Sequence, residues 1–324
     1  MGLEGVLDGF QGKKVAVIGD VMLDRYFWGS VSRISPEAPV PVCLIQSESE
    51  QLGGAANVAN NILALGAKPY LFGAIGDDEA GAAVLGLLEK NGLFREGLVR
   101  EPGRTTTVKL RIIAEDQHVV RVDRETTAPI AAATRARILD LFCELSDIFD
   151  AVIFQDYNKG VLGEELIGAL LRRARERAKP IAVDPKFDNF FAYQGVSLFK
   201  PNILELGRIV EKKVTPENEA EVVDSVLSRL GAAALLLTKG KKGMSLYQPN
   251  RPAEHIPAFT VEVYDVSGAG DTVIATFALA LAAGAGYYEG MLLSNHAAAV
   301  ACAKIGAQPV SAAEVRAALR QNRR

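Results

Sequence analysis

The stretch DVSGAGDTVIATFALALAAG, Asp265 to Gly284, joins a run of small residues to a long apolar segment. Small residues such as Gly268 and Gly270 open what we predict to be a long helix. The free backbone N–H groups and the positive end of a helix attract anions. Asp271 nevertheless follows directly, inside the first turn, and puts a carboxylate beside any bound phosphate. The stretch therefore predicts an anion site with an acid built into it.

The apolar part of this helix, Val273 to Ala285, is too short to span a bilayer, so we interpret it as a core helix. Outward from it, short apolar runs alternate with helical patterns along most of the chain. The predicted strands fall within residues 13–24, 68–78, 150–160, 180–186, 197–202 and 233–240. Such alternation is typical of a parallel sheet covered by helices on both faces.

Two regions, about 22–50 and 104–125, show a strand-like alternation of polar and apolar residues instead, as in the run VKLRI. One buried and one exposed face is typical of an antiparallel sheet. We therefore expect one α/β domain over residues 1–324, from which a small inserted β-sheet projects.

The overall composition excludes several classes of protein. The 324 residues carry a formal net charge of −3, from 36 basic and 39 acidic residues, which argues against binding to nucleic acid. The cysteines Cys43, Cys143 and Cys302 lack metal-binding spacing, and no signal peptide is recognisable. We therefore expect reduced thiols, a cytoplasmic location and no association with a membrane.

Neither common nucleotide fingerprint is present. In a GxGxxG pattern the third glycine would fall at Val273, and no GxxxxGK[ST] loop occurs. The failed spacing disfavours a dehydrogenase. The glycines at the start of the predicted helix keep two interpretations, tight helix packing or an anion site.

Three further fragments carry small and polar residues of the kind that bind ligands. The adjacent glycines of LGGAANVA would let a ligand approach the backbone, and its asparagine can donate to and accept from a polyol hydroxyl. The NxxE of FKPNILEL suits a hydrated Mg²⁺ beside phosphate oxygens, and the TKG of LLLTKGKKG ends a strand where a nucleotide fits. Each fragment alone has an equally common structural explanation. The residues are Gly53, Gly54, Asn57, Asn202, Glu205, Thr238 and Gly240.

The order and spacing of these fragments resemble the ribokinase-like family of sugar kinases, also called the PfkB family. The resemblance covers nearly the whole chain, and its signature regions are LGGAANVANNILALGA and DVSGAGDTVIATFALAL. It implies an α/β three-layer sandwich with a mostly parallel central sheet and a small inserted β-sheet as a lid. The segments GDVMLDRYFWGSVSRISPEAPVPV and FQDYNKGVL resemble the branch that phosphorylates D-glycero-β-D-manno-heptose 7-phosphate at C1, for lipopolysaccharide core heptose.

Other activities stay open at this point. A kinase for ribose, fructose or a fructose phosphate would share the catalytic motif, and a non-catalytic sugar- or nucleotide-binding protein would share the fold. A binding protein, however, has no need of Asp271. Some members of the heptose branch carry a nucleotidyltransferase with an HxGH motif, which none of His118, His255 and His296 matches. We therefore expect a stand-alone kinase.

The family pattern assigns the catalytic roles to the helix start. Asp271 would take the proton of the attacking hydroxyl, and the backbone of Gly268, Ala269 and Gly270 would form an anion hole for the transferring phosphoryl group. We expect the positive helix end to keep this carboxylate ionised.

The same pattern places the cofactors ATP and Mg²⁺. Asn202 and Glu205 would position Mg²⁺, with Glu205 acting through water and phosphate. Thr238 and Gly240 would lie beside the nucleotide, and the adenine between them and the helix that carries Asn295. A requirement for K⁺ stays open.

On the sugar side the pattern points to Asp24, Gly53, Gly54 and Asn57. The acceptor already bears a phosphate, so a cation must meet it. Positions after strand ends favour Lys186, with Asn158 as a polar helper. We expect Lys109 and Arg111 to lie on opposite faces of one strand, so that only one points into the site. The candidate cations are Arg33, Lys109, Arg111, Arg121 and Lys186.

The inserted sheet would close over the sugar and exclude water. In the family it often pairs with the sheet of a second subunit, and the apolar runs VPVCLI and VKLRII support a homodimer through the lid sheets. The expected partners are a sugar phosphate, ATP and a second copy of the chain, without nucleic acid or membrane.

Overall fold

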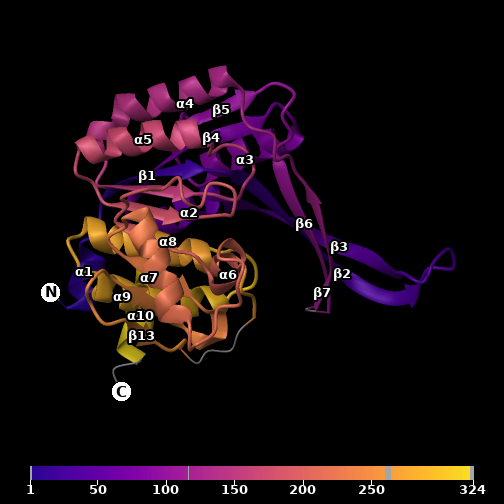
Figure 1. Ribbon diagram of the computed structural model, residues 1–324. Helices are drawn as coiled ribbons and strands as arrows, with labels where there is room; N and C mark the ends of the chain where they lie inside the picture. The colour runs from indigo at the N-terminus through magenta and orange to yellow at the C-terminus, as the bar shows by residue number, and fades with distance from the viewer. Residues whose placement is uncertain (1, 116, 260–263, 322–324) are drawn as a thin grey trace.

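The computed structural model describes residues 2–115, 117–259 and 264–321, which form two sheets with helices around the larger one (Figure 1). In those residues the larger sheet has nine strands. In spatial order they are β13 (Glu254–Ile256), β12 (Met244–Tyr247), β11 (Leu235–Thr238), β10 (Leu198–Phe199), β9 (Ile181–Asp184), β8 (Ala151–Gln155), β1 (Lys14–Gly19), β4 (Lys68–Gly76) and β5 (Leu98–Glu101).

This sheet is mostly parallel, as predicted. All neighbours from β11 to β5 run parallel, and only β12 and β13 run antiparallel at one edge. All six predicted strands are present in it; β5, β12 and β13 were not predicted.

Strand β1 explains why the sheet is covered on both faces. Val15 and Val17 pack into one apolar core, Ala16 and Ile18 pack into a second core, and all four side chains are fully buried. Successive side chains of a strand point to opposite faces, so a continuous apolar run needs a helical layer on each side.

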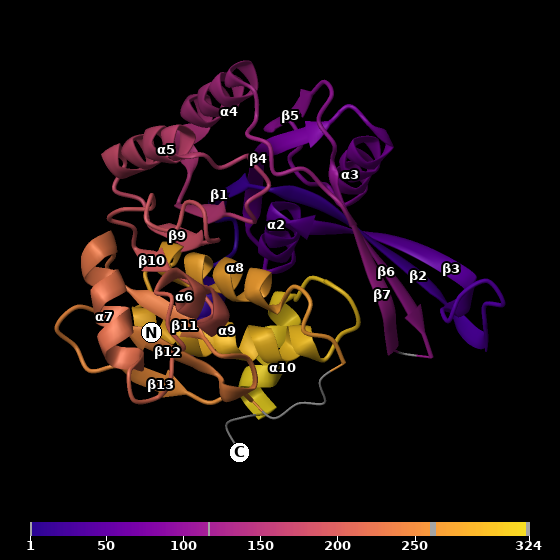
Figure 2. The ribbon, with the colours of Figure 1, turned by 45° about the vertical axis from the view of Figure 1, so that its right-hand side comes forward.

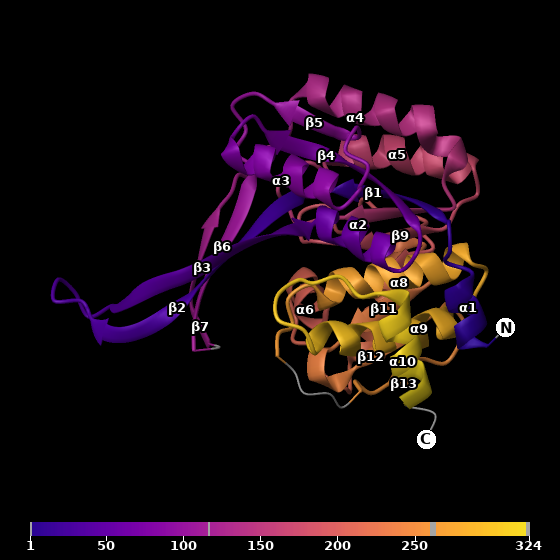
Figure 3. The same ribbon diagram turned by 180° about the vertical axis from the view of Figure 1, so that it is seen from behind.

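The helices form those two layers, and the α/β three-layer fold is confirmed. The first core includes side chains from α1 (Leu3–Asp8), α2 (Ala55–Ala64), α3 (Glu79–Lys90), α8 (Ala269–Ala282), α9 (Tyr287–Cys302) and α10 (Ala312–Gln321). The second includes side chains from α4 (Ala132–Leu145), α5 (Glu164–Glu176), α6 (Ile203–Ile209) and α7 (Glu219–Leu230). Figure 3 shows α2, α8, α9 and α10 from behind. None of the helices in the described ranges combines the length and apolar character needed to cross a bilayer.

The smaller sheet, which we call the lid, projects from the larger one (Figure 2). Its strands lie in the order β3 (Pro41–Gly54), β2 (Val21–Ile34), β6 (Thr107–Ala114) and β7 (Gln117–Arg124). β2 pairs antiparallel with β3, and β6 with β7, but β2 and β6 run parallel. The prediction of a purely antiparallel sheet was therefore wrong, because the chain returns through the main sheet between β3 and β6.

Gly54 marks the passage from the lid into helix α2. Its φ of +58° lies in the left-handed region, and a Cβ there would be 2.3 Å from the carbonyl oxygen of Asp20. Only glycine fits this turn. The close approach fixes where α2, and with it Asn57, begins relative to the main sheet.

Candidate active site

Four polar groups gather at the carboxyl ends of the central strands, where open parallel sheets bind ligands. β8 ends at Gln155, β9 ends at Asp184, and Lys200 follows β10 directly. Asp271 reaches the same place from the first turn of α8. The exposed fractions of the four residues are only 0%, 8%, 3% and 4%, respectively, so the charges of Asp184, Lys200 and Asp271 interact with little screening by water.

The carboxylate of Asp271 accepts three side-chain hydrogen bonds. Asn57 Nδ2 lies 2.7 Å from Oδ2, while Gln155 Nε2 and the Tyr157 hydroxyl lie 3.1 and 2.9 Å from Oδ1. Burial nevertheless raises the pKa of Asp271 to about 6, against the effect expected from the helix end. A pKa just below neutrality leaves most of the carboxylate ionised at pH 7 and able to accept a proton.

Gln155 joins this carboxylate to a buried ion pair. Its Nε2 donates to Asp184 Oδ2 and to Asp271 Oδ1, at 3.1 Å each, and Lys200 Nζ lies 3.0 Å from Asp184 Oδ2. Beyond the effect of burial, Asp184 raises the pKa of Asp271 and Lys200 lowers it. Lys200 therefore compensates two neighbouring carboxylates.

The start of α8 offers backbone N–H groups beside Asp271. The N-cap Gly268 has φ +76°, and a Cβ there would lie 2.9 Å from Asn57 Nδ2, so glycine lets Asn57 reach the carboxylate. The amide of Ala269 donates to the Val266 carbonyl at 3.3 Å. Within the described ranges, Gly268 and Gly270 are thus the members of the predicted anion hole whose amides have no partner.

A cavity of about 300 Å³ opens beside Ala269 and Gly270. Apolar side chains such as Met244 and Phe259 form part of its wall, which suits an adenine ring. The structure brings together here four of the five residues that the sequence assigned to ATP and Mg²⁺, namely Asn202, Thr238, Gly240 and Asn295.

Glu205 is held beside this cavity but does not line it. It forms a capping box with Asn202, whose backbone N–H donates to Glu205 Oε2 at 2.8 Å. Its Oε1 pairs with Lys186 Nζ. Burial lowers the pKa of Lys186, but the pairing with Glu205 outweighs that effect and leaves this pKa raised. In the described part of the chain, no three His, Cys, Asp or Glu residues are grouped so as to hold a metal ion by themselves.

The lid carries several of the residues that the sequence assigned to the sugar. Arg111 Nη1 lies 2.7 Å from Asp24 Oδ1, and a Cβ at Gly53 would lie 2.7 Å from Asp24 Oδ2. Lys109 Nζ lies 5.0 Å from the ring centre of Tyr157, whose hydroxyl bonds Asp271. The lid face that carries Asp24 and Lys109 is thus linked directly to the candidate base.

The prediction that Lys109 and Arg111 face opposite ways was wrong. Positions two apart on a strand share a face, and both side chains lie beside Asp24: Lys109 pairs with it in register, and Arg111 bonds it. Arg33 is exposed near the far end of β2, and the exposed Arg121 bonds both carboxylate oxygens of Asp123. The structure brings neither of these arginines to Asp271.

Sequence reasoning missed Gln155, Tyr157, Asp184 and Lys200. Each lies at or just after the carboxyl end of a central strand. That position is itself a signal for ligand binding in an open α/β sheet, and we applied it only to Lys186 and Asn158.

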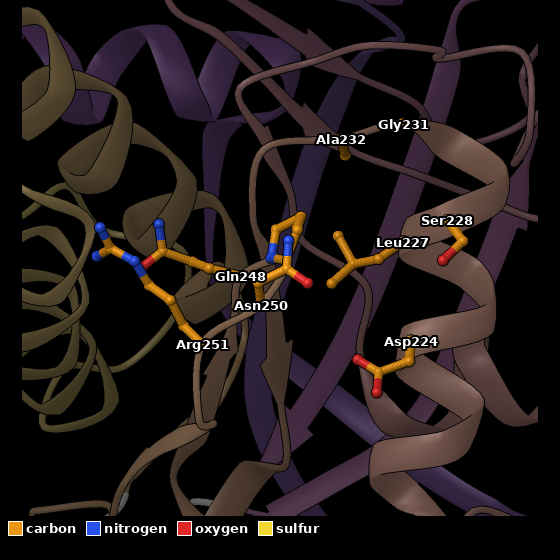
Figure 4. Close-up of a pocket in the computed structure, with 9 residues that line it drawn as sticks. Asp224, Leu227, Ser228, Gly231, Ala232, Gln248, Asn250 and Arg251 are labelled. Carbon is orange, nitrogen blue, oxygen red and sulfur yellow. The ribbon is translucent and has the colours of Figure 1, made fainter.

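A larger hollow, of about 570 Å³, lies elsewhere, between α7 and residues 248–251 (Figure 4). It is lined by Asp224, Leu227, Ser228, Gly231, Ala232, Gln248, Pro249, Asn250 and Arg251. None of these residues contacts Asp271 or was predicted to bind a ligand, so size alone does not identify the candidate site.

Tyr157→Phe should move the pH dependence of any reaction that uses Asp271 as a base. Because the base must be ionised, the wild-type rate should fall as the pH drops through about 6, the pKa of Asp271. Beyond burial, the Tyr157 hydroxyl lowers this pKa, so its removal should shift the acid limb of kcat/KM to higher pH. We expect kcat to fall about tenfold, since hydrogen bonds to charged groups contribute roughly 1.5–3 kcal/mol.

Tyr193→Phe is the matched control. The Tyr193 hydroxyl donates to Asp156 at 2.7 Å, and burial raises the pKa of Asp156 to about 6 as well. This variant loses an equivalent bond to a carboxylate that does not touch Asp271. An acid limb that stays in place in Tyr157→Phe, or moves equally in both variants, would argue against Tyr157 as a positioning residue for Asp271.

Comparison with known proteins gives consistent matches. The model of the family described as pfkB family carbohydrate kinase matches residues 12–314. The bifunctional protein HldE of Caulobacter vibrioides is 43% identical over 310 residues, 95% of this chain and 64% of that protein. The protein of the same name from Geobacter metallireducens is 41% identical over 302 residues, 92% of this chain and 61% of that protein. The chain thus spans somewhat less than two thirds of these curated relatives.

Solved structures share the fold at low sequence identity. Escherichia coli phosphofructokinase-2 in complex with potassium has a TM-score of 0.80 at 17% identity, over 97% of this chain and 100% of that one. Arabidopsis thaliana ribokinase complexed with ribose and ATP has a TM-score of 0.75 at 18% identity, over 95% of this chain and 99% of that one.

Proposed function

Since this chain belongs to the pfkB family of carbohydrate kinases, we propose that it phosphorylates D-glycero-β-D-manno-heptose 7-phosphate at C1. The phosphoryl donor is ATP, and the product is the 1,7-bisphosphate used for lipopolysaccharide core heptose. That the enzyme is a sugar kinase follows from the family; the heptose is the finer proposal. It is supported by the segments GDVMLDRYFWGSVSRISPEAPVPV and FQDYNKGVL and by the identity with the HldE proteins.

The observation that carries the proposal is the placement of Asp271. Its carboxylate is held by Asn57 from α2 and by Tyr157, which lies next to the lid residue Lys109. The residues just before it, Ala269 and Gly270, line the cavity assigned to the nucleotide. A group in this position can meet both an acceptor hydroxyl and the terminal phosphate of ATP.

In the proposed reaction the acceptor oxygen forms a bond to the γ-phosphorus while the bond from that phosphorus to the ADP oxygen breaks. The hydroxyl proton passes to Asp271. The amides of Gly268 and Gly270 point their N–H dipoles at the transferring group, and Lys200 adds positive charge, since its Nζ lies 3.5 Å from the position of a Cβ on Gly270. Positioning and charge stabilisation matter most, because the transition state of phosphoryl transfer is loose.

Magnesium fits this site as an ion bound mainly through phosphate and water. Mg²⁺ in phosphoryl-transfer sites usually keeps several waters and needs few protein ligands, which agrees with the absence of a three-ligand cluster among the described residues. Glu205 and Asn202 would hold the hydrated ion against the phosphates. When bound, the ion neutralises charge on the phosphate oxygens.

Buried acceptor atoms without partners support a polyol as the acceptor. In the described part of the chain these atoms are Oε1 of Gln51, Oε1 of Gln155 and Oδ1 of Asn158. Gln155 bonds Asp271, Asn158 follows Tyr157, and Gln51 pairs in register with Asp24. Buried polar atoms are nearly always hydrogen-bonded, and sugar hydroxyls would donate to them.

An ADP-release assay over a panel of sugars tests the proposal. The panel contains heptose 7-phosphate, unphosphorylated heptose, ribose, fructose and fructose 6-phosphate, and the product is checked for phosphate at C1. We expect the highest kcat/KM for heptose 7-phosphate. A higher kcat/KM for another sugar would overturn the heptose assignment while leaving the enzyme a sugar kinase.

We also propose a cytoplasmic homodimer that pairs through the lid sheets. The lid exposes large apolar side chains, such as Ile34, Leu44 and Val122, with exposed fractions of 61%, 57% and 51%. Apolar surface on a thin projecting sheet with open strand edges is typical of an interface.

Charge on the lid should separate the subunits. Leu44→Glu combined with Val122→Glu should turn a dimer into a monomer at micromolar concentration in sedimentation velocity, because each carboxylate would be buried in the interface. Ile148→Glu, an exposed apolar position outside the lid, should leave the dimer intact. A monomeric wild type, or dimers in both variants, would contradict pairing through the lid.

A further inference from the structure

The phosphate on the acceptor sugar requires a cation, and the ion pairs within the lid determine which cation is free to bind it. An anion that is taken out of water needs a positive partner whose charge is not already compensated. Most candidate cations of this protein are engaged by carboxylates. This inference rests on the proposed function, because it concerns the phosphate already present on the acceptor.

The two carboxylates next to Lys109 are each held by an arginine. Lys109 lies in register between Asp24 on β2 and Asp123 on β7. Asp24 Oδ1 accepts from Arg111 at 2.7 Å. Asp123 accepts from Arg121 with both oxygens, at 2.9 and 3.0 Å. The neighbours that would neutralise Lys109 are therefore already neutralised by other residues.

Lys109 itself makes no ion pair with any residue that the structure describes. Its side chain is half-buried, and burial lowers its pKa, with only partial compensation from Asp24. Its ammonium lies 5.0 Å from the ring centre of Tyr157, which is a weak partner for a desolvated charge. An uncompensated ammonium in such surroundings is a favourable place for an anion.

Lys186, the second lysine near Tyr157, differs from Lys109 in having a carboxylate partner. Lys186 Nζ lies 5.4 Å from the centre of the same ring, but it is paired with Glu205 beside the nucleotide cavity. The sequence favoured Lys186 for the acceptor phosphate because it follows a strand end. Its pairing places it on the nucleotide side, which reverses that preference.

We propose that Lys109 binds the phosphate that the acceptor sugar already carries. Lys109 and Asp24 share one lid face, so the lid would hold a sugar hydroxyl at Asp24 and the phosphate at Lys109. Tyr157 lies between Lys109 and Asp271, and keeps the phosphate-binding cation close to the base without an ion pair between them. The lysine thereby selects phosphorylated sugars.

Lys109→Met tests this assignment, because it keeps an unbranched side chain and removes the charge. Calorimetry without ATP should show about a 10- to 100-fold loss of affinity for heptose 7-phosphate, the equivalent of one charge-assisted hydrogen bond. The KM for ATP should not change, and Lys109→Arg should recover part of the affinity. Arg33→Met, which removes an exposed lid cation near the far end of β2, should bind heptose 7-phosphate like the wild type.

The unphosphorylated heptose separates recognition of the phosphate from damage to the lid. Lys109→Met should turn it over as slowly as the wild type does, without further loss. Unchanged affinity for heptose 7-phosphate, or an equal loss for both sugars, would overturn the role of Lys109. If the wild type prefers fructose 6-phosphate and Lys109→Met binds that sugar phosphate more weakly, the heptose proposal falls while the role of Lys109 stands.

Discussion

Asp271→Asn should reduce kcat by about 10²–10⁴-fold, the usual contribution of a general base, while ATP still binds. Asparagine is nearly isosteric, and its oxygen can still accept from Gln155 and Tyr157. Its NH2 group would stand in place of Oδ2, so the side-chain amide of Asn57 must turn over to keep its bond. What the variant loses is the ability to take the hydroxyl proton. The measurements are kcat with the best acceptor from the sugar panel, and ATP affinity by calorimetry.

Asp156→Asn provides the comparison for this variant. Asp156 is also buried, with a pKa raised by burial to about 6, but it bonds Tyr193 and does not contact Asp271. If a raised pKa alone marked the base, the two substitutions would have similar effects. We expect far smaller loss of turnover from Asp156→Asn; near-normal turnover in Asp271→Asn would reject the base assignment.

Of the substitutions proposed for this protein, Lys200→Met should lower the free energy of unfolding the most. Lys200 and Asp184 are both buried, and breaking a buried ion pair of this kind typically costs about 3–5 kcal/mol. Burial has the largest effect on the pKa of Asp271 and raises it, and the hydrogen bonds from Asn57 and Tyr157 lower it. The charge of Lys200 also lowers this pKa, and Lys200→Met removes that charge. Urea denaturation should therefore show a lower midpoint, and the acid limb of kcat/KM should move to higher pH.

The double variant Lys200→Met with Asp184→Asn separates these effects. Removing both charges leaves neither member of the Lys200–Asp184 ion pair buried without its partner, so most of the lost stability should return. Because Asp184 raises the pKa of Asp271, its neutralisation should also bring the acid limb back toward lower pH. Two losses that simply add would show that the ion pair does not couple Lys200 to the carboxylates.

The pattern of apolar residues was sufficient to predict the main sheet. β1, with Val15 to Ile18 buried on alternate faces, is a fully apolar run that is stable only between two helical layers. The sequence also grouped Asn202, Thr238 and Asn295 as one predicted nucleotide site, and these three residues do line one cavity. The spacing of apolar residues and the presence of short motifs depend only on residues close together in the chain, so they can be recognised from a single sequence.

The lid was predicted less well, because pairing between distant strands is not a local property. The parallel pairing of β2 with β6 depends on where the chain returns from the main sheet. The mistaken orientation of Lys109 and Arg111 had a simpler origin: residues two apart on a strand always share a face. That error hid the arrangement in which Arg111 engages Asp24 and leaves Lys109 uncompensated.

By itself the sequence determined the α/β architecture, the sugar-kinase family and Asp271 as the acid at the helix start. Only the tertiary structure decided what surrounds that acid. Gln155, Asp184 and Lys200 come from three different strand ends: Gln155 donates a hydrogen bond to Asp271, and Asp184 and Lys200 act on it through their charges. Such effects depend on distances between segments far apart in the chain, and the free energy of a buried charge is set by those distances.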